Sequence, residues 1–158
     1  MDPKWLTRAE MIAWRAFIET SGDLFAALER DLAEHGLTLG DYQVLVYLSE
    51  AEDDSMRMCD LADALQLSPS GLTRRLDGLV KSGLVTRLAS TEDRRVMMGV
   101  LTEAGRALLT RTAPHHVASV RRHIFDHLTA DQADAMASIF LAISAGLAAD
   151  TASTGDVA

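Results

Sequence analysis

The feature that most constrains the fold is a change in the spacing of apolar residues near position 84. Before it, and again after residue 101, apolar residues recur at steps of three and four, which is the spacing of amphipathic helices. Residues 84–88 and 96–101 instead form two short apolar runs around a polar, charged stretch. Two such runs predict a β-hairpin. The chain is therefore predicted to be mostly α with one small hairpin.

Helix-capping residue types set the predicted helix boundaries. Thr38–Asp41 and Thr129–Gln132 have the pattern of capping boxes, in which the first and fourth side chains bond each other's backbone N–H groups. Ser68 followed by Pro69 is typical of an N-cap and a first helical position, and Gly83 ends that helix. The predicted helices cover about residues 11–35, 38–50, 60–67, 69–82, 102–126 (with a bend at Pro114) and 129–149.

Charge is distributed unevenly along the chain. The formal net charge is -8 and the pI about 5.0. Residues 1–55 hold 4 basic and 12 acidic side chains, whereas residues 56–106 hold 8 basic and 6 acidic ones. A basic centre between acidic arms is typical of a DNA-binding module joined to another structure. Because the overall charge repels DNA, we expect binding to depend on specific contacts.

The order of the central elements predicts a winged helix-turn-helix, in which the second helix enters the major groove and the hairpin contacts the DNA backbone. The second helix, residues 69–82, has apolar residues at core spacing and a polar opposite face. Asp77 lies on that face, where DNA phosphates would repel it, so we expect it to hold a neighbouring arginine. The predicted DNA contacts are Ser68, Ser70, Gly71, Thr73, Arg74, Arg75, Lys81, Arg87, Arg94 and Arg95.

Four linked motifs resemble those of MarR-family transcriptional regulators. Leu67–Asp77 and Leu79–Arg87 are similar to the family's recognition helix and first wing strand. Asp93–Arg95 resembles its D-x-R wing signature, and Leu101–Gly105 its L-T-x-x-G entry into the next helix. The flanking helices agree in number and length, so the resemblance covers about residues 8–148.

This resemblance implies a cytoplasmic homodimer with interlocking N- and C-terminal helices. Such a dimer binds a palindromic operator in double-stranded DNA, and a small aromatic or lipophilic ligand releases the repressor. The apolar stripes of the first and last two helices support pairing independently, because the central module is too small to cover them. We expect four segments: residues 1–36 (N-terminal dimerisation helix), 37–101 (winged module), 102–149 (C-terminal dimerisation helices) and 150–158 (flexible tail).

The resemblance also implies a ligand crevice between the dimer helices and the DNA-binding module. The matching residues are Trp14, Arg15, Phe17, Ile18, Tyr42, Val46 and Tyr47. An apolar, partly aromatic pocket with one guanidinium would suit a phenolic carboxylate. The alternative is that these aromatic residues, at helical spacing, are ordinary core residues.

Other functions find weaker support. His116, His123 and His127 share a helical face and are weak candidates for zinc, which leaves a metal-responsive regulator as an alternative. Cys59 is a single cysteine without a resolving partner, so we expect an inert thiol rather than an oxidant sensor. We find no catalytic motif and expect neither an enzyme nor a cofactor. A helical dimer that binds small molecules but no DNA is the remaining alternative.

Neither a secretory signal nor a membrane span is expected. The first residues lack the apolar core of a signal peptide. No uninterrupted apolar run approaches the roughly 20 residues that cross a bilayer.

Overall fold

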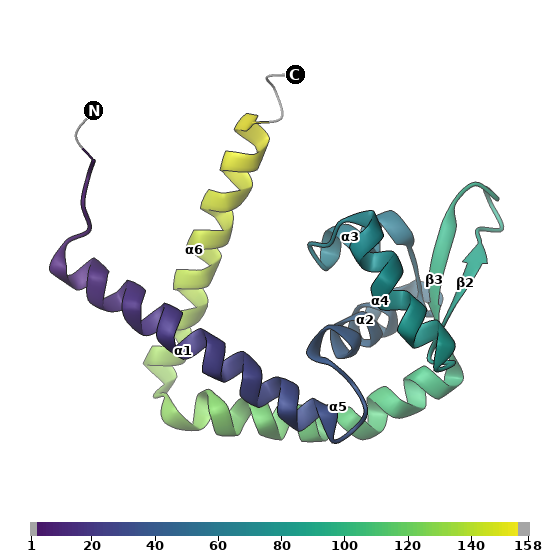
Figure 1. The fold of residues 1–158 in the computed structure, drawn as a ribbon, viewed down its shortest axis with the longest axis horizontal. Helices are drawn as coiled ribbons and strands as arrows, with labels where there is room; N and C mark the ends of the chain where they lie inside the picture. The colour runs from purple at the N-terminus through teal and green to yellow at the C-terminus, as the bar shows by residue number, and fades with distance from the viewer. Residues whose placement is uncertain (1–2, 155–158) are drawn as a thin grey trace. The chain divides into compact units, whose positions relative to one another are not determined.

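The computed structural model describes residues 3–154, and the side chains of residues 3–150. It divides into two compact units, residues 1–119 and 120–158, which are described separately. The first unit contains α1 (Arg8–Ala33), α2 (Leu39–Glu50), η1 (Glu52–Asp54), β1 (Ser55–Arg57), α3 (Met58–Ala64), α4 (Pro69–Lys81), β2 (Val85–Ala89), β3 (Met97–Leu101) and most of α5 (Glu103–His123) (Figure 1). The second contains the end of α5, η2 (Phe125–His127) and α6 (Ala130–Thr154).

The predicted caps of α2 and α4 are confirmed. Thr38 and Asp41 bond each other's backbone N–H groups, both at 3.1 Å. The Ser68 hydroxyl accepts the Gly71 N–H at 3.1 Å, with Pro69 in the first helical position. Both caps satisfy N–H groups that a helix start leaves without intrahelical acceptors.

The predicted starts of α1 and α3 were wrong by two or three residues. Thr7 and Glu10 form a capping box, so α1 starts at Arg8. The predicted start, residue 11, is the first residue of the apolar stripe. Helix α3 starts at Met58 rather than residue 60, and its N-cap, Arg57, makes no side-chain cap bond. A helix start without a capping side chain leaves no signal in the sequence.

The hairpin is confirmed, and a third strand joins it. Strands β2 and β3 pair antiparallel with Arg87 opposite Gly99, and β1 pairs antiparallel on the other side of β3. We expected a loop where β1 begins at Ser55. Three residues are too few for an alternating pattern, and Asp53 and Asp54 reach β1 through left-handed backbone, with φ of 52° and 56°.

A leucine core holds α4 against the other helices of the module. Its fully buried members come from α1, α2, α3 and α4. Each buried leucine contributes on the order of 1.5–3 kcal/mol. The polar face of α4 is turned outward as a consequence, and α4 lies beside β2 (Figure 1). These leucines are Leu32, Leu45, Leu48, Leu61, Leu72 and Leu76.

Helix α5 begins at the predicted cap and continues through Pro114 without interruption. The Thr102 hydroxyl accepts the Gly105 N–H at 3.0 Å and donates to the Gly83 carbonyl at 2.7 Å. The helix ends at His123, three residues before the predicted end, and a short 3-10 turn follows. Pro114 therefore does not end the helix.

Helix α6 is longer and more apolar than predicted. Its Thr129–Gln132 capping box is confirmed. The helix continues to Thr154, into the predicted tail, of which residues 155–158 lie outside the described part. Residues 130–150 are long and apolar enough to cross a membrane by length and composition, contrary to our expectation from apolar runs. Ser138 and Ser144 interrupt the apolar runs, while the Ala, Ile, Phe and Leu side chains around them keep the mean hydropathy high.

Gly105 allows α5 to start against Leu84, the residue just before β2. A Cβ at this position would overlap the backbone carbonyl oxygen of Leu84. Gly105→Ala is therefore expected to lower the free energy of unfolding by about 1–3 kcal/mol. Gly78→Ala is the matched control, because it faces open space inside α4 and should raise stability by about 0.5–1 kcal/mol. Urea unfolding measures both, and an equally stable Gly105→Ala protein would contradict this packing.

Candidate nucleic-acid interface

The exposed face of α4 carries short hydroxyl side chains followed by an arginine. Ser70, Thr73 and Arg74 are exposed, while the leucines of the opposite face are buried. The Thr73 hydroxyl donates to the Pro69 carbonyl at 2.9 Å, and the Ser70 and Ser68 hydroxyls lie 3.2 Å apart. These bonds hold the hydroxyls in fixed positions while their remaining hydrogen-bonding capacity faces outward.

Arg74 borders an open groove along α4. The groove has a volume of about 530 Å³ and runs between α4 and the first turn of α2. In the part of the chain that the structure describes, Arg74 forms no ion pair. Its guanidinium can therefore bind a base edge or a phosphate. The groove is lined by Thr38, Asp41, Leu67, Gly71, Arg74, Arg75 and Gly78.

Arg75 has a different environment from its neighbour. Its guanidinium packs over Gly40, where a Cβ would collide with it. One Nη donates to the Thr38 hydroxyl at 3.4 Å and lies 3.7 Å from the Asp41 carboxylate. Arg75 thus joins α4 to the start of α2, and the absence of a side chain at Gly40 makes this contact possible.

Asp77 holds an arginine, as predicted, and that arginine is Arg87 of β2. One Nη of Arg87 lies 2.8 Å from the Asp77 carboxylate, and the other donates to the Thr73 carbonyl at 2.8 Å. Asp77 and Thr73 are one turn apart on α4, so the guanidinium spans that turn. Two of the ten predicted DNA contacts, Arg75 and Arg87, are therefore engaged with other parts of the module.

The hairpin tip carries two exposed arginines, Arg94 and Arg95. The Asp93 carboxylate accepts the Arg95 N–H at 2.9 Å, which fixes the turn in which both arginines lie. Lys81, at the end of α4, is also exposed. Among residues 3–150 these three cations form no ion pair, nor does the exposed Arg57 of β1, so most of the module's free positive charge lies at the tip and along α4.

The predicted ligand residues fall into two groups. Trp14 and Phe17 have ring centroids 6.2 Å apart on an exposed stretch of α1 that also holds Arg15 and Ile18. Tyr42 is buried, with Val46 half-buried and Tyr47 at the margin of exposure. Tyr42 belongs to the core cluster that includes Leu32, which lies about 27 Å along α1 from Trp14 at 1.5 Å per residue. A single chain therefore does not bring these seven residues together in one pocket.

Two side chains of α5, Thr112 and His116, have buried polar atoms, and Thr112 was not among the predicted site residues. His116 has its ring centroid 4.3 Å from that of Tyr42. Its Nδ1 and the hydroxyl of Thr112, one turn away, are buried and have no hydrogen-bond partner in the structure. Burial lowers the pKa of His116 and raises the pKa of Tyr42. The sequence shows that Thr112 and His116 are four residues apart and so share one face of the helix. It does not show which helix packs against that face.

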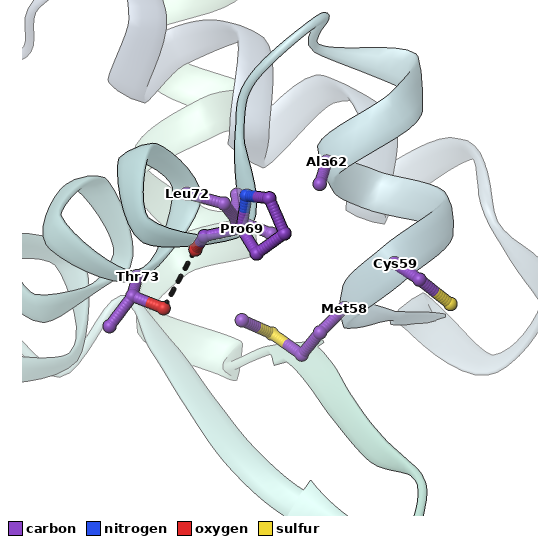
Figure 2. Close-up of a pocket in the computed structure, with 6 residues that line it drawn as sticks. All are labelled: Met58, Cys59, Ala62, Pro69, Leu72 and Thr73. Carbon is purple, nitrogen blue, oxygen red and sulfur yellow. Dashed lines mark hydrogen bonds between the residues drawn. The ribbon is translucent and has the colours of Figure 1, made fainter. Parts of the chain in front are cut away.

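The metal site and the single cysteine are the weaker candidates. Among the described residues, no group of three or more His, Cys, Asp or Glu could hold a metal ion. Cys59 is exposed, and its thiol lies 3.3 Å from an Asp60 carboxylate oxygen. It borders a groove of about 180 Å³ between α3 and α4 (Figure 2). Figure 2 shows that the Met58 side chain, rather than the thiol, extends toward Thr73.

Comparison with known proteins gives consistent results. The MarR family model matches residues 35–96. The HTH-type transcriptional repressor YetL of Bacillus subtilis is 32% identical over 93 residues, which are 59% of this chain. The matched region spans 56% of YetL and 63% of the B. subtilis regulator MhqR, so it covers less than two thirds of these curated relatives.

Similarity to solved structures extends over nearly the whole chain. AbsC, a MarR family transcriptional regulator from Streptomyces coelicolor, is 41% identical with a TM-score of 0.89, over 93% of this chain and 99% of AbsC. Sco3205, a MarR family regulator from the same organism solved in complex with DNA, is 35% identical with a TM-score of 0.88, over 92% of each chain. CouR from Rhodococcus jostii, solved with p-coumaroyl-CoA, is 26% identical with a TM-score of 0.71, over 81% of this chain and 88% of CouR.

Proposed function

Since the chain belongs to the MarR family of transcriptional regulators, we propose that it is a DNA-binding repressor that reads the major groove with α4. The observation that carries the proposal is that Arg74, which forms no ion pair among residues 3–150, lies beside the exposed hydroxyls of Ser70 and Thr73. Arg94 and Arg95, at the hairpin tip, supply phosphate contacts. The Sco3205 structure with DNA supports this assignment.

Arg74 and Arg94 are expected to contribute differently. Arg74→Ala should weaken binding to the duplex that wild-type protein enriches from a random-sequence library by about tenfold, and relax its base preference. Arg94→Ala should weaken binding to that duplex and to a scrambled one equally. It should also reduce the slope of log K against log salt by about 1. Fluorescence anisotropy over a salt series measures both.

Arg111→Ala is the control, because Arg111 is an exposed arginine of α5 outside the winged module. It should bind like wild type. Wild-type affinity and slope in the Arg74 and Arg94 variants would refute the contact assignment.

We further propose that the protein is a homodimer. Support comes from apolar side chains that one chain leaves exposed on helices outside the module. On α6, Ile139, Leu141 and Ile143 are each more than half exposed, and on α1 so is Trp14. Exposed apolar surface of this extent is typical of a protein interface. A two-fold dimer with recognition helices about 34 Å apart would bind a palindromic operator.

Ile143→Glu is expected to convert the dimer to monomers, because a carboxylate would be buried at the interface without a partner. Sedimentation velocity at micromolar concentration measures the change in mass. Leu88→Glu is the matched control, since Leu88 is an equally exposed apolar residue of β2 outside these helices. A wild-type chain that sediments as a monomer would contradict the dimer.

The repressor is released, we propose, by an aromatic or lipophilic anion bound between α2 and α5. Tyr42 and His116 supply aromatic rings there, and Thr112 and His116 supply buried polar atoms without partners. Helix α2 contacts α4, so a ligand that displaces α2 would also displace the recognition helix. The p-coumaroyl-CoA in CouR supports this ligand class. The α1 surface around Trp14 and Arg15 is the second candidate.

Phenolic carboxylates test this site. Millimolar 4-hydroxybenzoate or 4-hydroxycinnamate should raise the melting temperature of the wild type and release the enriched duplex, whereas cyclohexanecarboxylate should do neither. Thr112→Val should melt higher than wild type without ligand, because it removes a buried hydroxyl that has no partner, and should lose the ligand-dependent rise. Absence of any shift with both phenolic acids would rule out this effector class.

Two further assignments follow from the proposal. Because α6 lies within the region similar to DNA-binding regulators, we assign its apolar surface to protein contact rather than to a membrane, in a cytoplasmic protein. The relatives are regulators, which supports a function without catalysis or cofactor. A zinc-dependent change in DNA binding would instead favour the metal-responsive alternative built on His116, His123 and His127.

A further inference from the structure

Arg87 connects the hairpin to the middle of the recognition helix. Its two Nη atoms reach the Asp77 carboxylate and the Thr73 carbonyl, each at 2.8 Å. Its Nε is buried and has no acceptor in the structure, so the whole guanidinium is directed at α4. A fork of two hydrogen bonds fixes orientation as well as distance.

Beyond Arg87 the hairpin loses its support from the core. Val85, two residues earlier on β2, is 1% exposed, whereas Leu88 is 53% exposed. Met97, the first residue of β3 after the tip, is 43% exposed. Arg87 is therefore the outermost attachment between the module and the segment that carries Arg94 and Arg95.

Charge balance argues against a direct role of Arg87 in DNA binding. The Asp77 carboxylate neutralises its guanidinium, and a phosphate would have to displace that carboxylate. Asp77 is 60% exposed on the side of α4 that faces outward, so alone it would repel DNA. The pair therefore adds no net charge to the interface.

We infer that Arg87 is a positioning residue that holds the hairpin tip, residues 90–96, at a fixed place relative to α4. This inference rests on the proposed function of the winged module. With the Arg87–Asp77 pair intact, α4 and the tip can engage one DNA site together. Without the pair, the tip moves independently, and the protein loses discrimination between sequences rather than general attraction to DNA.

Hydrogen exchange in the absence of DNA tests the attachment itself. Arg87→Ala should speed exchange of the hairpin amides, including the Ser90 N–H that bonds the Val96 carbonyl at 2.8 Å. Arg121→Ala is the matched control, because it removes an arginine–carboxylate pair, with Asp126, outside the module. It should leave hairpin exchange unchanged. Unchanged exchange in Arg87→Ala would overturn the positioning role.

DNA binding tests the consequence. The charge-neutral double variant, Arg87→Ala with Asp77→Ala, should weaken binding to the enriched duplex about tenfold, with binding to a scrambled duplex and the salt slope unchanged. Each single variant should lose the same factor in the ratio of the two affinities, because each removes the same contact. Arg87→Lys should recover only part of the affinity, since one ammonium lacks the rigid fork.

The opposite results would show that Arg87 contacts DNA. In that case the double variant would lower the salt slope by about 1, and Asp77→Ala would strengthen binding by removing a repulsive charge while keeping the preference for the enriched duplex. If the wild type enriches no duplex, the proposed function fails, and the exchange measurement still decides whether Arg87 holds the hairpin.

Discussion

The burial of leucine side chains between α2, α3 and α4 is the interaction on which the rest of the structure depends. Leu45, Leu48, Leu61, Leu72 and Leu76 are at most 1% exposed, so this contact excludes water completely. It determines which face of α4 is turned outward and therefore which side chains are available to DNA. It also makes α2 and α4 move together, so a ligand that displaces α2 acts on the recognition helix through close packing.

The arginines of the module fall into two groups, those that pair with a carboxylate and those that do not. Arg75 and Arg87 are held by Asp41 and Asp77, and they connect α4 to α2 and to the hairpin. Arg74 and the tip arginines form no ion pair among the described residues. The net charge of -8 is thus compatible with DNA binding, because most of the free cations of the module lie on one helix and one loop. Affinity then depends on geometry more than on bulk attraction.

The exposed apolar side chains outside the module bear on how the protein assembles. Stretches of α1 and α6 carry exposed apolar side chains, and in the proposed dimer a second copy offers an identical surface. The same apolarity makes α6 long and hydrophobic enough to cross a membrane by composition. Composition alone cannot distinguish a protein interface from a membrane, because apolar groups are stabilised in both by removal from water.

The sequence by itself determined the helices with strong caps, the hairpin, the recognition helix and the family, because these depend on residues close together in the chain. It also predicted that Asp77 holds an arginine, since a carboxylate facing phosphates needs a counter-charge. Only the tertiary structure decided that this arginine is Arg87, that β1 adds a third strand, and that His116 lies against Tyr42. Those contacts join residues distant in sequence, and periodicity identifies the face of an element without identifying what packs against it.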